Sequence, residues 1–221
     1  MNEFKANIPF KFYTRLHLSE LTGCQASSLK ELLKMLEHIS GSSIYHHTHR
    51  FLQQHQYLSP EPPNDFAYWV REHLGEEELG ERLSSIDTIQ FSSIRDLRNK
   101  IISTIKDYIK LNPKCLKKHS NQKFYFIKSV SFVLYTGYEA YNLNDFCEIL
   151  SKITIDSIYY HIFESRLRLE KGKNDFSNWF ENILKEKELA WEIEKLDPYT
   201  HTMEELRNTI IKIIKKRIKN D

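Results

Sequence analysis

Two short motifs each occur twice in this chain, and this repetition limits its possible folds more than any other feature. Ser-Ile-Tyr-His-His begins at Ser43, and Asn-Asp-Phe-Ala-Tyr-Trp begins at Asn64. The variants Ser-Ile-Tyr-Tyr-His and Asn-Asp-Phe-Ser-Asn-Trp begin at Ser157 and Asn174, which lie 114 and 110 residues further along. Other matched residues keep the same order, and the offset falls to 109 near the end of each copy. Such small changes are typical of loop insertions, so the sequence predicts an internal duplication.

The repeat predicts how the chain is divided. We expect a first half at residues 1–112, a connector at 113–122 and a second half at 123–221. Two copies are too few for a solenoid, which needs three or more stacked repeats. The expectation is therefore one compact unit whose halves pack about a pseudo-two-fold axis, by analogy with a symmetric dimer. Two separate small domains would also fit the length. Concave ligand sites often form between such parts, so we expect any ligand in the groove between the halves.

Apolar residues at helical spacing dominate both halves and predict a mainly α fold, with about five helices in each half. Ser28 and Glu31 have the spacing of a capping box at the start of one helix. Phe10–Tyr13 and Phe124–Leu134 are rich in aromatic and β-branched residues with some alternation, which favours short strands. Short apolar runs are equally compatible with buried helix, so the sequence leaves this choice open.

Composition excludes several classes of protein. The net charge of +2 gives no concentrated basic surface, so we expect no nucleic-acid partner. No run of eighteen apolar residues occurs, and the three cysteines form no CxxC pair. These features predict a soluble, cytoplasmic protein that does not bind membranes. There is no GxGxxG, P-loop, GxSxG or HExxH motif, which disfavours Rossmann, NTPase, serine hydrolase and zincin chemistry.

Several longer stretches carry a family resemblance. They are Ser42–His55 with Pro62–Val70, and later Lys128–Val133 and Leu196–Thr202. Together they resemble an uncharacterised prokaryotic family that is known only as a domain of unknown function, number 5752. The resemblance covers essentially the whole chain. It implies no established reaction, cofactor, partner or catalytic residue.

The histidine and aspartate that recur in both halves suggest the sharpest chemical hypothesis. His47 and His161 match one another, as do Asp65 and Asp175. If a two-fold arrangement brought all four together, they would form a ligand set suited to zinc, iron or manganese, and such a metal could activate water. The alternative is that each histidine is a hydrogen-bonded structural residue and that Asn-Asp caps a helix. We favour no cofactor, with a divalent metal as the alternative.

The first half also contains a local histidine cluster of His46, His47, His49 and His55, but the second half keeps only His161. A three-histidine site would therefore belong to the first half alone. His161 and Glu164 have the i, i+3 spacing of carboxylate-bridged metal bundles. Arg50 occupies the position of Glu164 in the first half, which argues against a duplicated metal site.

Recurrent arginines and aromatic residues offer two further hypotheses. Arg98 and Arg207 open the last helix of each half, where they either bridge to aspartates or grip an anionic ligand. Tyr45 and Tyr159, with Trp69 and Trp179, either belong to the core or form an aromatic floor for a sugar. We favour the structural interpretation in both cases.

The prediction for function is a non-catalytic module that binds a small anionic or carbohydrate-like ligand, or a partner protein; an enzyme is less favoured. The alternative is a metal-dependent hydrolase that uses the repeated His/Asp set. A purely structural role in a homo-oligomer is the third hypothesis. The candidate ligand-binding residues are Tyr45, His47, Asp65, Trp69, Arg98, Tyr159, His161, Asp175, Trp179 and Arg207.

Overall fold

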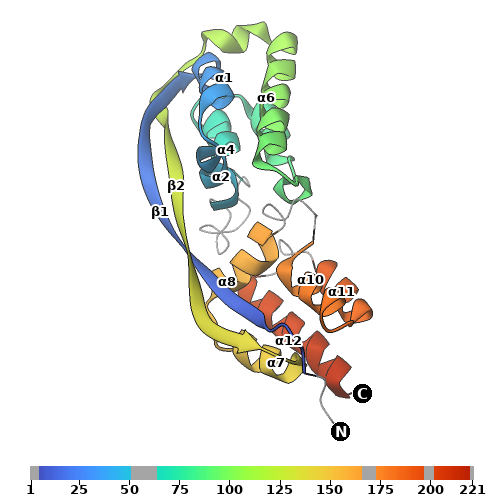
Figure 1. Cartoon of the computed structure of the whole chain (residues 1–221). Helices are drawn as coiled ribbons and strands as arrows, with labels where there is room; N and C mark the ends of the chain where they lie inside the picture. The colour runs from blue at the N-terminus through green and yellow to red at the C-terminus, as the bar shows by residue number, and fades with distance from the viewer. Residues whose placement is uncertain (1–4, 51–63, 166–172, 197–201, 220–221) are drawn as a thin grey trace. The chain divides into compact units, whose positions relative to one another are not determined.

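Two long paired strands run beside the helices of this protein. The computed structural model describes residues 5–50, 64–165, 173–196 and 202–219. Strand β1, Phe10–Ser28, has 19 residues, and strand β2, His119–Ala140, has 22. They pair with each other in a two-stranded sheet. The prediction of a mainly α fold is therefore wrong, and the fold mixes helices with an antiparallel β-ribbon (Figure 1).

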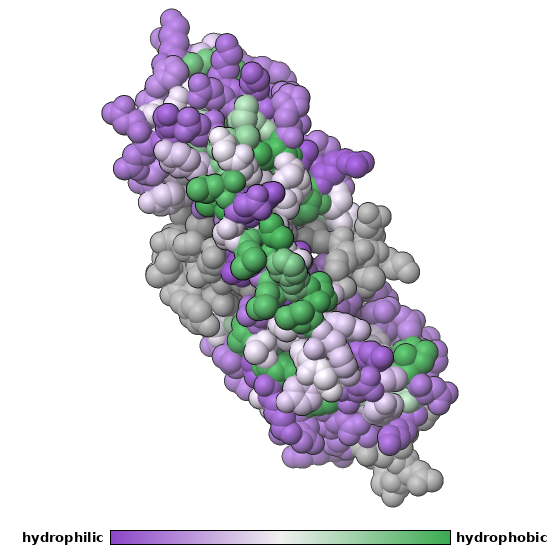
Figure 2. Space-filling view, turned by 60° about the vertical axis from the view of Figure 1, so that its left-hand side comes forward, coloured by the Kyte–Doolittle hydropathy of each residue, from purple (hydrophilic) through white to green (hydrophobic). Residues whose placement is uncertain are grey.

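The strands extend far beyond the short segments that the sequence suggested. The sequence did not predict this length because few of the side chains along it are buried. β1 buries side chains near its two ends, at Phe10, Phe12, Ala26 and Ser28. In β2 the four consecutive apolar residues from Phe132 to Tyr135 are all exposed. Figure 2 shows apolar side chains exposed on the face that the strands occupy. The period-two pattern that marks a strand depends on burial of one face, so here it is limited to the buried segments of each strand.

The chain divides into two compact units. The continuous unit is residues 17–130, and the split unit is residues 1–16 together with 131–221. Each unit therefore contains one segment of β1 and one segment of β2. β2 begins inside the predicted connector, at His119.

The continuous unit places its helices against the strand segments, and α1 and α2 pack on α6. Phe124 and Phe126 of β2 lie in the same core as Phe66 of α4 and Leu97 of α6. Its helical elements are α1 Leu29–His38, α2 Gly41–Tyr45, η1 His46–Arg50, α4 Asp65–Glu72, α5 Glu77–Ser84, η2 Thr88–Gln90, α6 Ile94–Leu111 and η3 Pro113–Lys117.

The split unit is built in the same way from the other ends of the strands. Phe10 and Phe12 of β1 pack against Phe146 of α7 and Phe176 of α10, although more than 130 residues separate them in sequence. Helix α12 packs on α7, α8 and α11. The helical elements are α7 Leu143–Leu150, α8 Ile155–Tyr159, η4 Tyr160–Glu164, α10 Asp175–Asn182, α11 Lys187–Glu194 and α12 Met203–Lys219.

Local capping chemistry explains where the helices begin. The Ser28 hydroxyl accepts a hydrogen bond from the backbone N–H of Glu31, which confirms the predicted cap of α1. Asn64 and Asn174 cap α4 and α10 through their side-chain oxygens. The asparagine side chains thus accept hydrogen bonds from backbone N–H groups at the helix starts. Capping therefore does not use the carboxylates of the aspartates that follow them.

The α-helix α2, which contains Ser43, ends at Tyr45. Residues His46–Arg50 form a π-helix, and the corresponding segment Tyr160–Glu164 of the split unit does the same. Residues 51–63, which include His55, lie outside the described part of the chain. π-Turns are rare and often occur at functional positions. Both π-turns here carry one of the repeated histidines.

Helices α4 and α10 end in the same turn, but with different residues. Gly75 and Lys185 both have φ of 64°. The following N–H groups, of Glu76 and Glu186, donate to the carbonyls of Val70 and Phe180. This left-handed conformation costs a residue other than glycine about 1–2 kcal/mol. We expect Lys185→Gly to stabilise the protein by about 1 kcal/mol and Gly75→Ala to destabilise it by a similar amount, measured as shifts in chemical denaturation. A change in stability in the same direction for both substitutions would contradict this interpretation.

Within the described residues, no helix has the length and apolar character needed to cross a lipid bilayer.

Candidate functional site

In the continuous unit, the π-turn holds the imidazole of His47 between a helix start and a strand. Its Nδ1 lies 2.6 Å from Oδ2 of Asp65, the first residue of α4. Its Nε2 accepts a hydrogen bond of 2.9 Å from the backbone N–H of Ile127 in β2. The side chain of His47 is only 3% exposed, and its ring packs against Phe124 with 4.7 Å between centroids. His47 therefore joins α4 to β2 within the core.

In the split unit, His161 makes the same contacts. Its Nδ1 lies 2.8 Å from Oδ2 of Asp175 at the start of α10. Its Nε2 accepts a hydrogen bond of 2.9 Å from the backbone N–H of Tyr13 in β1. The ring is packed edge-on against Phe10. In both units the strand that receives the histidine lies in the other half of the predicted repeat.

The hydrogen bonds determine which nitrogen of each imidazole carries the proton. An Nε2 that accepts from a backbone N–H has no proton of its own, so a neutral ring carries its proton on Nδ1 and donates it to the aspartate. Both nitrogens of His47 and of His161 are thus occupied by protein groups. A metal ion could bind either ring only by displacing one of these partners.

The structure places the four repeated residues in two pairs, one pair in each unit. His47 and Asp65 belong to the continuous unit, and His161 and Asp175 to the split unit. Among the described residues, no group of three or more histidine, cysteine, aspartate or glutamate side chains is arranged to hold a metal ion.

The other histidines of the first-half cluster make separate contacts. His46 lies 3.0 Å from the Ser129 hydroxyl through Nδ1. His49 contacts the Thr48 hydroxyl and stacks on Tyr45 with an interplanar angle of 4°. In the split unit, Glu164 is buried and pairs with Arg15 of β1. The described residues of the cluster therefore each have a different protein partner.

His46 makes the stability of the protein depend on pH. Burial lowers its pKa from 6.5 to about 4, and the neighbouring His47 adds to this effect. In the unfolded chain His46 takes up a proton below about pH 6.5, but in the folded protein it does so only near pH 4. We therefore expect its contribution to stability to be complete above pH 6.5 and to fall by about 3 kcal/mol as the pH drops to 4. Denaturation midpoints of His46→Gln should show a shallower pH dependence over this window, and an unchanged slope would contradict the assignment.

The repeated aromatic residues contribute mainly to the core, as the structural interpretation expected. Trp69 and Trp179 are 3% and 5% exposed. The indole N–H of Trp69 donates to the carbonyl of Gln122, and that of Trp179 to the carbonyl of Ile8. Tyr45 and Tyr159 are also buried, and Tyr159 stacks on Phe163. These contacts again tie helices to the strands or to the segment before them.

The repeated arginines reach backbone carbonyls at helix ends. Arg98 donates to the carbonyl of Ile39, the residue after α1, at 2.6 Å. Arg207 donates to the carbonyl of Ser151, the residue after α7, at 3.2 Å. A cation at a helix C-terminus is favoured by the helix dipole. The sequence indicated a structural contact to an aspartate, whereas these bonds are to carbonyl groups.

A groove of about 570 Å³ lies over the His161–Asp175 pair of the split unit. We name it the Trp179 groove. Its aromatic lining residues are Tyr13, which is half-buried, and Tyr160 and Trp179, which are each 5% exposed, and Asn178 and Asn182 of α10 supply exposed amides. The remaining lining residues are Ile8, Pro9, Phe10, Lys11, His161, Asp175 and Ile183. Sequence reasoning did not select Asn178 and Asn182, whose only signal is their i, i+4 spacing on the helix that begins with Asp175.

Two hydroxyl groups that sequence reasoning did not select complete the helix-to-strand contacts. Ser43 donates to the carbonyl of Ile127, and Ser157 donates to the carbonyl of Tyr13. The histidine and the serine of each motif therefore bind the N–H and the carbonyl of the same strand residue. The repetition of Ser-Ile-Tyr in both motifs was the available signal for this clamp.

Comparison with known proteins gives a family but no activity. The model of a family described only as a family of unknown function, DUF5752, matches residues 7–215. The structure of OrfY from Thermoproteus tenax is similar, with a TM-score of 0.81, 26% sequence identity and 96% of each chain covered. No curated protein matches the chain. The family predicted from the sequence motifs is therefore confirmed.

Proposed function

We propose that this chain, which belongs to the DUF5752 family of unknown function, is a non-catalytic protein that binds a small carbohydrate-like ligand in the Trp179 groove. The observation that supports this proposal most directly is the combination of aromatic walls with exposed amides in one groove. The Asn182 amide donates to the Asn178 amide oxygen at 2.7 Å, which leaves the NH2 group of Asn178 and the oxygen of Asn182 to suit hydroxyl groups. Half-buried Tyr13 offers ring surface for the apolar face of a sugar ring. Lys11, which also lines the groove and pairs with Glu139 at 3.6 Å, suits an acidic substituent.

The engagement of both histidine nitrogens favours binding over catalysis. A general base needs a nitrogen within reach of the substrate proton, and a hydrolytic metal needs free ligand atoms. In each unit the histidine already contacts an aspartate and a strand N–H. The metal-dependent hydrolase remains the second candidate, and it requires one of these contacts to open.

We also infer that the chain arose by internal duplication. The inference is supported by the clamp of His47 and Ser43 on Ile127, which has its counterpart in His161, Ser157 and Tyr13. In this interpretation each half donates its strand to the helices of the other. Tyr68 and Glu72 occupy the positions of Asn178 and Asn182, so the first half does not repeat the amides of the Trp179 groove.

The binding proposal can be tested by NMR titration of the full chain. The indole N–H of Trp179 gives one of only three tryptophan side-chain signals. We expect neutral and acidic mono- and disaccharides to shift this signal in a saturable way, and Asn178→Ala with Asn182→Ala to weaken binding at least tenfold. Tyr68→Ala with Glu72→Ala, at the equivalent positions of α4, is the matched control and should leave the affinity unchanged.

Two results would overturn the proposal. If no carbohydrate in the panel shifts the Trp179 signal, the groove does not bind this class of ligand. If the protein purified without chelator carries a stoichiometric metal that His161→Ala removes, and the loaded protein hydrolyses a substrate, the hydrolase replaces the binding function.

A further inference from the structure

One exposed face of helix α12 carries four lysines. Lys212, Lys215, Lys216 and Lys219 are spaced three or four residues apart, so they project from the same side of the helix over about 10 Å. All four are exposed, and with Asn208 and Ile211 they line a hollow of about 510 Å³. The ion pairs found among the described residues of the chain include none of these lysines. We name this surface the lysine face.

The lysine face is unfavourable for the isolated helix. Lys212 with Lys216, and Lys215 with Lys219, are like-charge i, i+4 pairs, each of which destabilises a helix. The helix dipole offsets this repulsion within the last turn, where Lys216 and Lys219 lie. It offers much less to Lys212 and Lys215, which lie further from the C-terminus.

Helix α6 of the continuous unit shows the same positions with their charges balanced. At the offset of 109, the four lysines correspond to Ser103, Lys106, Asp107 and Lys110. Lys106 pairs with Glu37 at 2.7 Å, and Lys110 pairs with Asp107 at 2.8 Å. In α12 both acidic partners are missing, because Asp107 is replaced by Lys216 and Glu37 by Ser151. Four cations thus stand where the matched helix is close to neutral.

Arg217 is a cation of α12 outside the lysine face, and its charge is balanced by a carboxylate. It pairs with Glu186 through two of its nitrogens, at 2.8 and 3.3 Å. The uncompensated charge is therefore restricted to one face of the helix.

We propose that the lysine face binds a small ligand that carries several phosphate groups. Lysine ammonium groups are compact point charges that suit phosphate oxygens, and a bound polyanion would relieve the repulsion between them. The hollow lacks aromatic residues on which bases could stack, which disfavours single-stranded nucleic acid. Its one apolar residue, Ile211, is half-buried, so the face has nothing to insert into a lipid bilayer.

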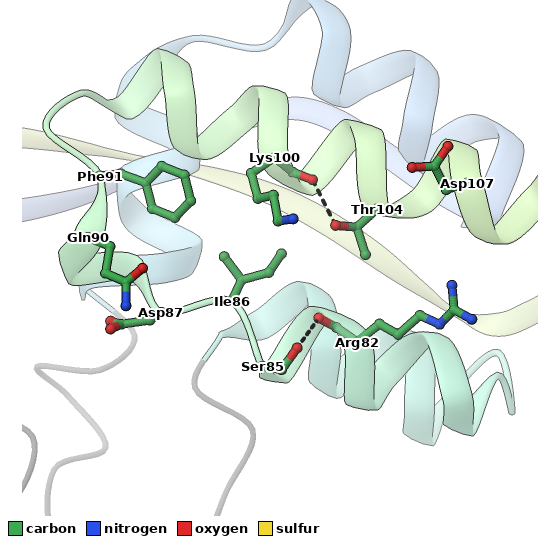
Figure 3. Close-up of a pocket in the computed structure, with 9 residues that line it drawn as sticks. All are labelled: Arg82, Ser85, Ile86, Asp87, Gln90, Phe91, Lys100, Thr104 and Asp107. Carbon is green, nitrogen blue, oxygen red and sulfur yellow. Dashed lines mark hydrogen bonds between the residues drawn. The ribbon is translucent and has the colours of Figure 1, made fainter.

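A second pocket, shown in Figure 3, suits such a ligand less well. It lies between α5 and α6 of the continuous unit and has a volume of about 440 Å³. Arg82 and Lys100 line it together with Asp87 and Asp107, so its charges cancel. Arg82 also pairs with Glu78, and Asp107 with Lys110. A polyanion would meet two carboxylates there and none among the residues that line the lysine face.

Tripolyphosphate is a suitable probe, because it has several charges and no base or lipid chain. We expect calorimetry of the full chain at low salt to show saturable binding of one tripolyphosphate. Lys212→Gln with Lys216→Gln should weaken it at least tenfold. Lys106→Gln with Lys110→Gln on α6 makes the same change in charge and should alter the affinity less than twofold. Tripolyphosphate should also raise the melting temperature of the unmodified protein, since it binds only the folded state.

Several outcomes would overturn the proposal. These are the absence of saturable binding, an equal loss with the α6 control pair, and tighter binding of a short oligonucleotide or of anionic vesicles than of tripolyphosphate. Removal of like charges should leave the α12 variant at least as stable as the parent. If the double variant nevertheless fails to fold, the single variants replace it, with a loss of about threefold expected for each.

Discussion

Replacing His161 with alanine should destabilise the split unit by about 3–5 kcal/mol. The substitution removes the hydrogen bond to the Asp175 carboxylate and leaves the backbone N–H of Tyr13 without its acceptor in a part-buried position. A lost hydrogen bond to a charged group costs about 1.5–3 kcal/mol, and an unsatisfied buried donor about 1–3 kcal/mol more. The ring also leaves a cavity beside Phe10 and Phe176. Chemical denaturation of the full chain measures the loss.

Asp175→Asn is the control that separates geometry from charge. The amide oxygen of asparagine can still accept the Nδ1 proton of His161, so the imidazole keeps both partners. We expect this variant to lose about 1 kcal/mol, a fraction of the loss in His161→Ala. If the two substitutions cost the same, the carboxylate charge and not the bridge to β1 determines the stability.

His47→Ala should have an effect of the same size in the other unit. His47 bridges Asp65 and Ile127 with nearly the same distances. Hydrogen exchange should localise the loss of protection to residues 17–130 for His47→Ala and to residues 1–16 and 131–221 for His161→Ala. Loss of protection spread evenly over the chain would show that the histidines do not act within separate units.

The sequence predicted the helical part of the fold well because each helix carries its own signal. The caps at Ser28 and Asn64 and the amphipathic pattern of α6 and α12 all depend on residues close in sequence. The sequence also selected His47, Asp65, His161 and Asp175, which the structure places in two hydrogen-bonded pairs. What sequence could not provide was the partner of each residue, because Tyr13 and Ile127 contribute backbone groups that carry no side-chain signature.

The length of the strands escaped prediction for a different physical reason, although the segments Phe10–Tyr13 and Phe124–Leu134 that favoured strand do lie within β1 and β2. Most side chains of the two-stranded ribbon are not buried, so alternation is limited to short segments, and the exposed run Phe132–Tyr135 resembles a core segment. Residues of β1 and β2 also pack against helices far away in sequence, as Phe12 does with Phe146. Local periodicity contains no information about such partners. The predicted boundaries at residues 112 and 123 follow the repeat, whereas the compact units follow packing.

Two fragments of nearly equal length should therefore differ completely in stability. Residues 17–130 and residues 1–112 both contain helices α1 to α6. Only the first contains Phe124 and Phe126, which lie in the core of the continuous unit, together with the N–H and carbonyl of Ile127 that His47 and Ser43 bind. Removing each phenylalanine from a core costs about 3–5 kcal/mol. Their joint loss approaches the whole stability of a small domain, about 5–15 kcal/mol.

We expect residues 17–130 to unfold cooperatively in circular dichroism and residues 1–112 to show no cooperative transition. Addition of residues 113–221 to the second fragment should restore the fold, because that piece supplies β2 and receives Phe10 and Phe12 of β1 in its own core. The restored complex should again lose stability when Phe126 is replaced with alanine. A fragment 1–112 that folds alone would show that the helices need no strand from the later part of the chain.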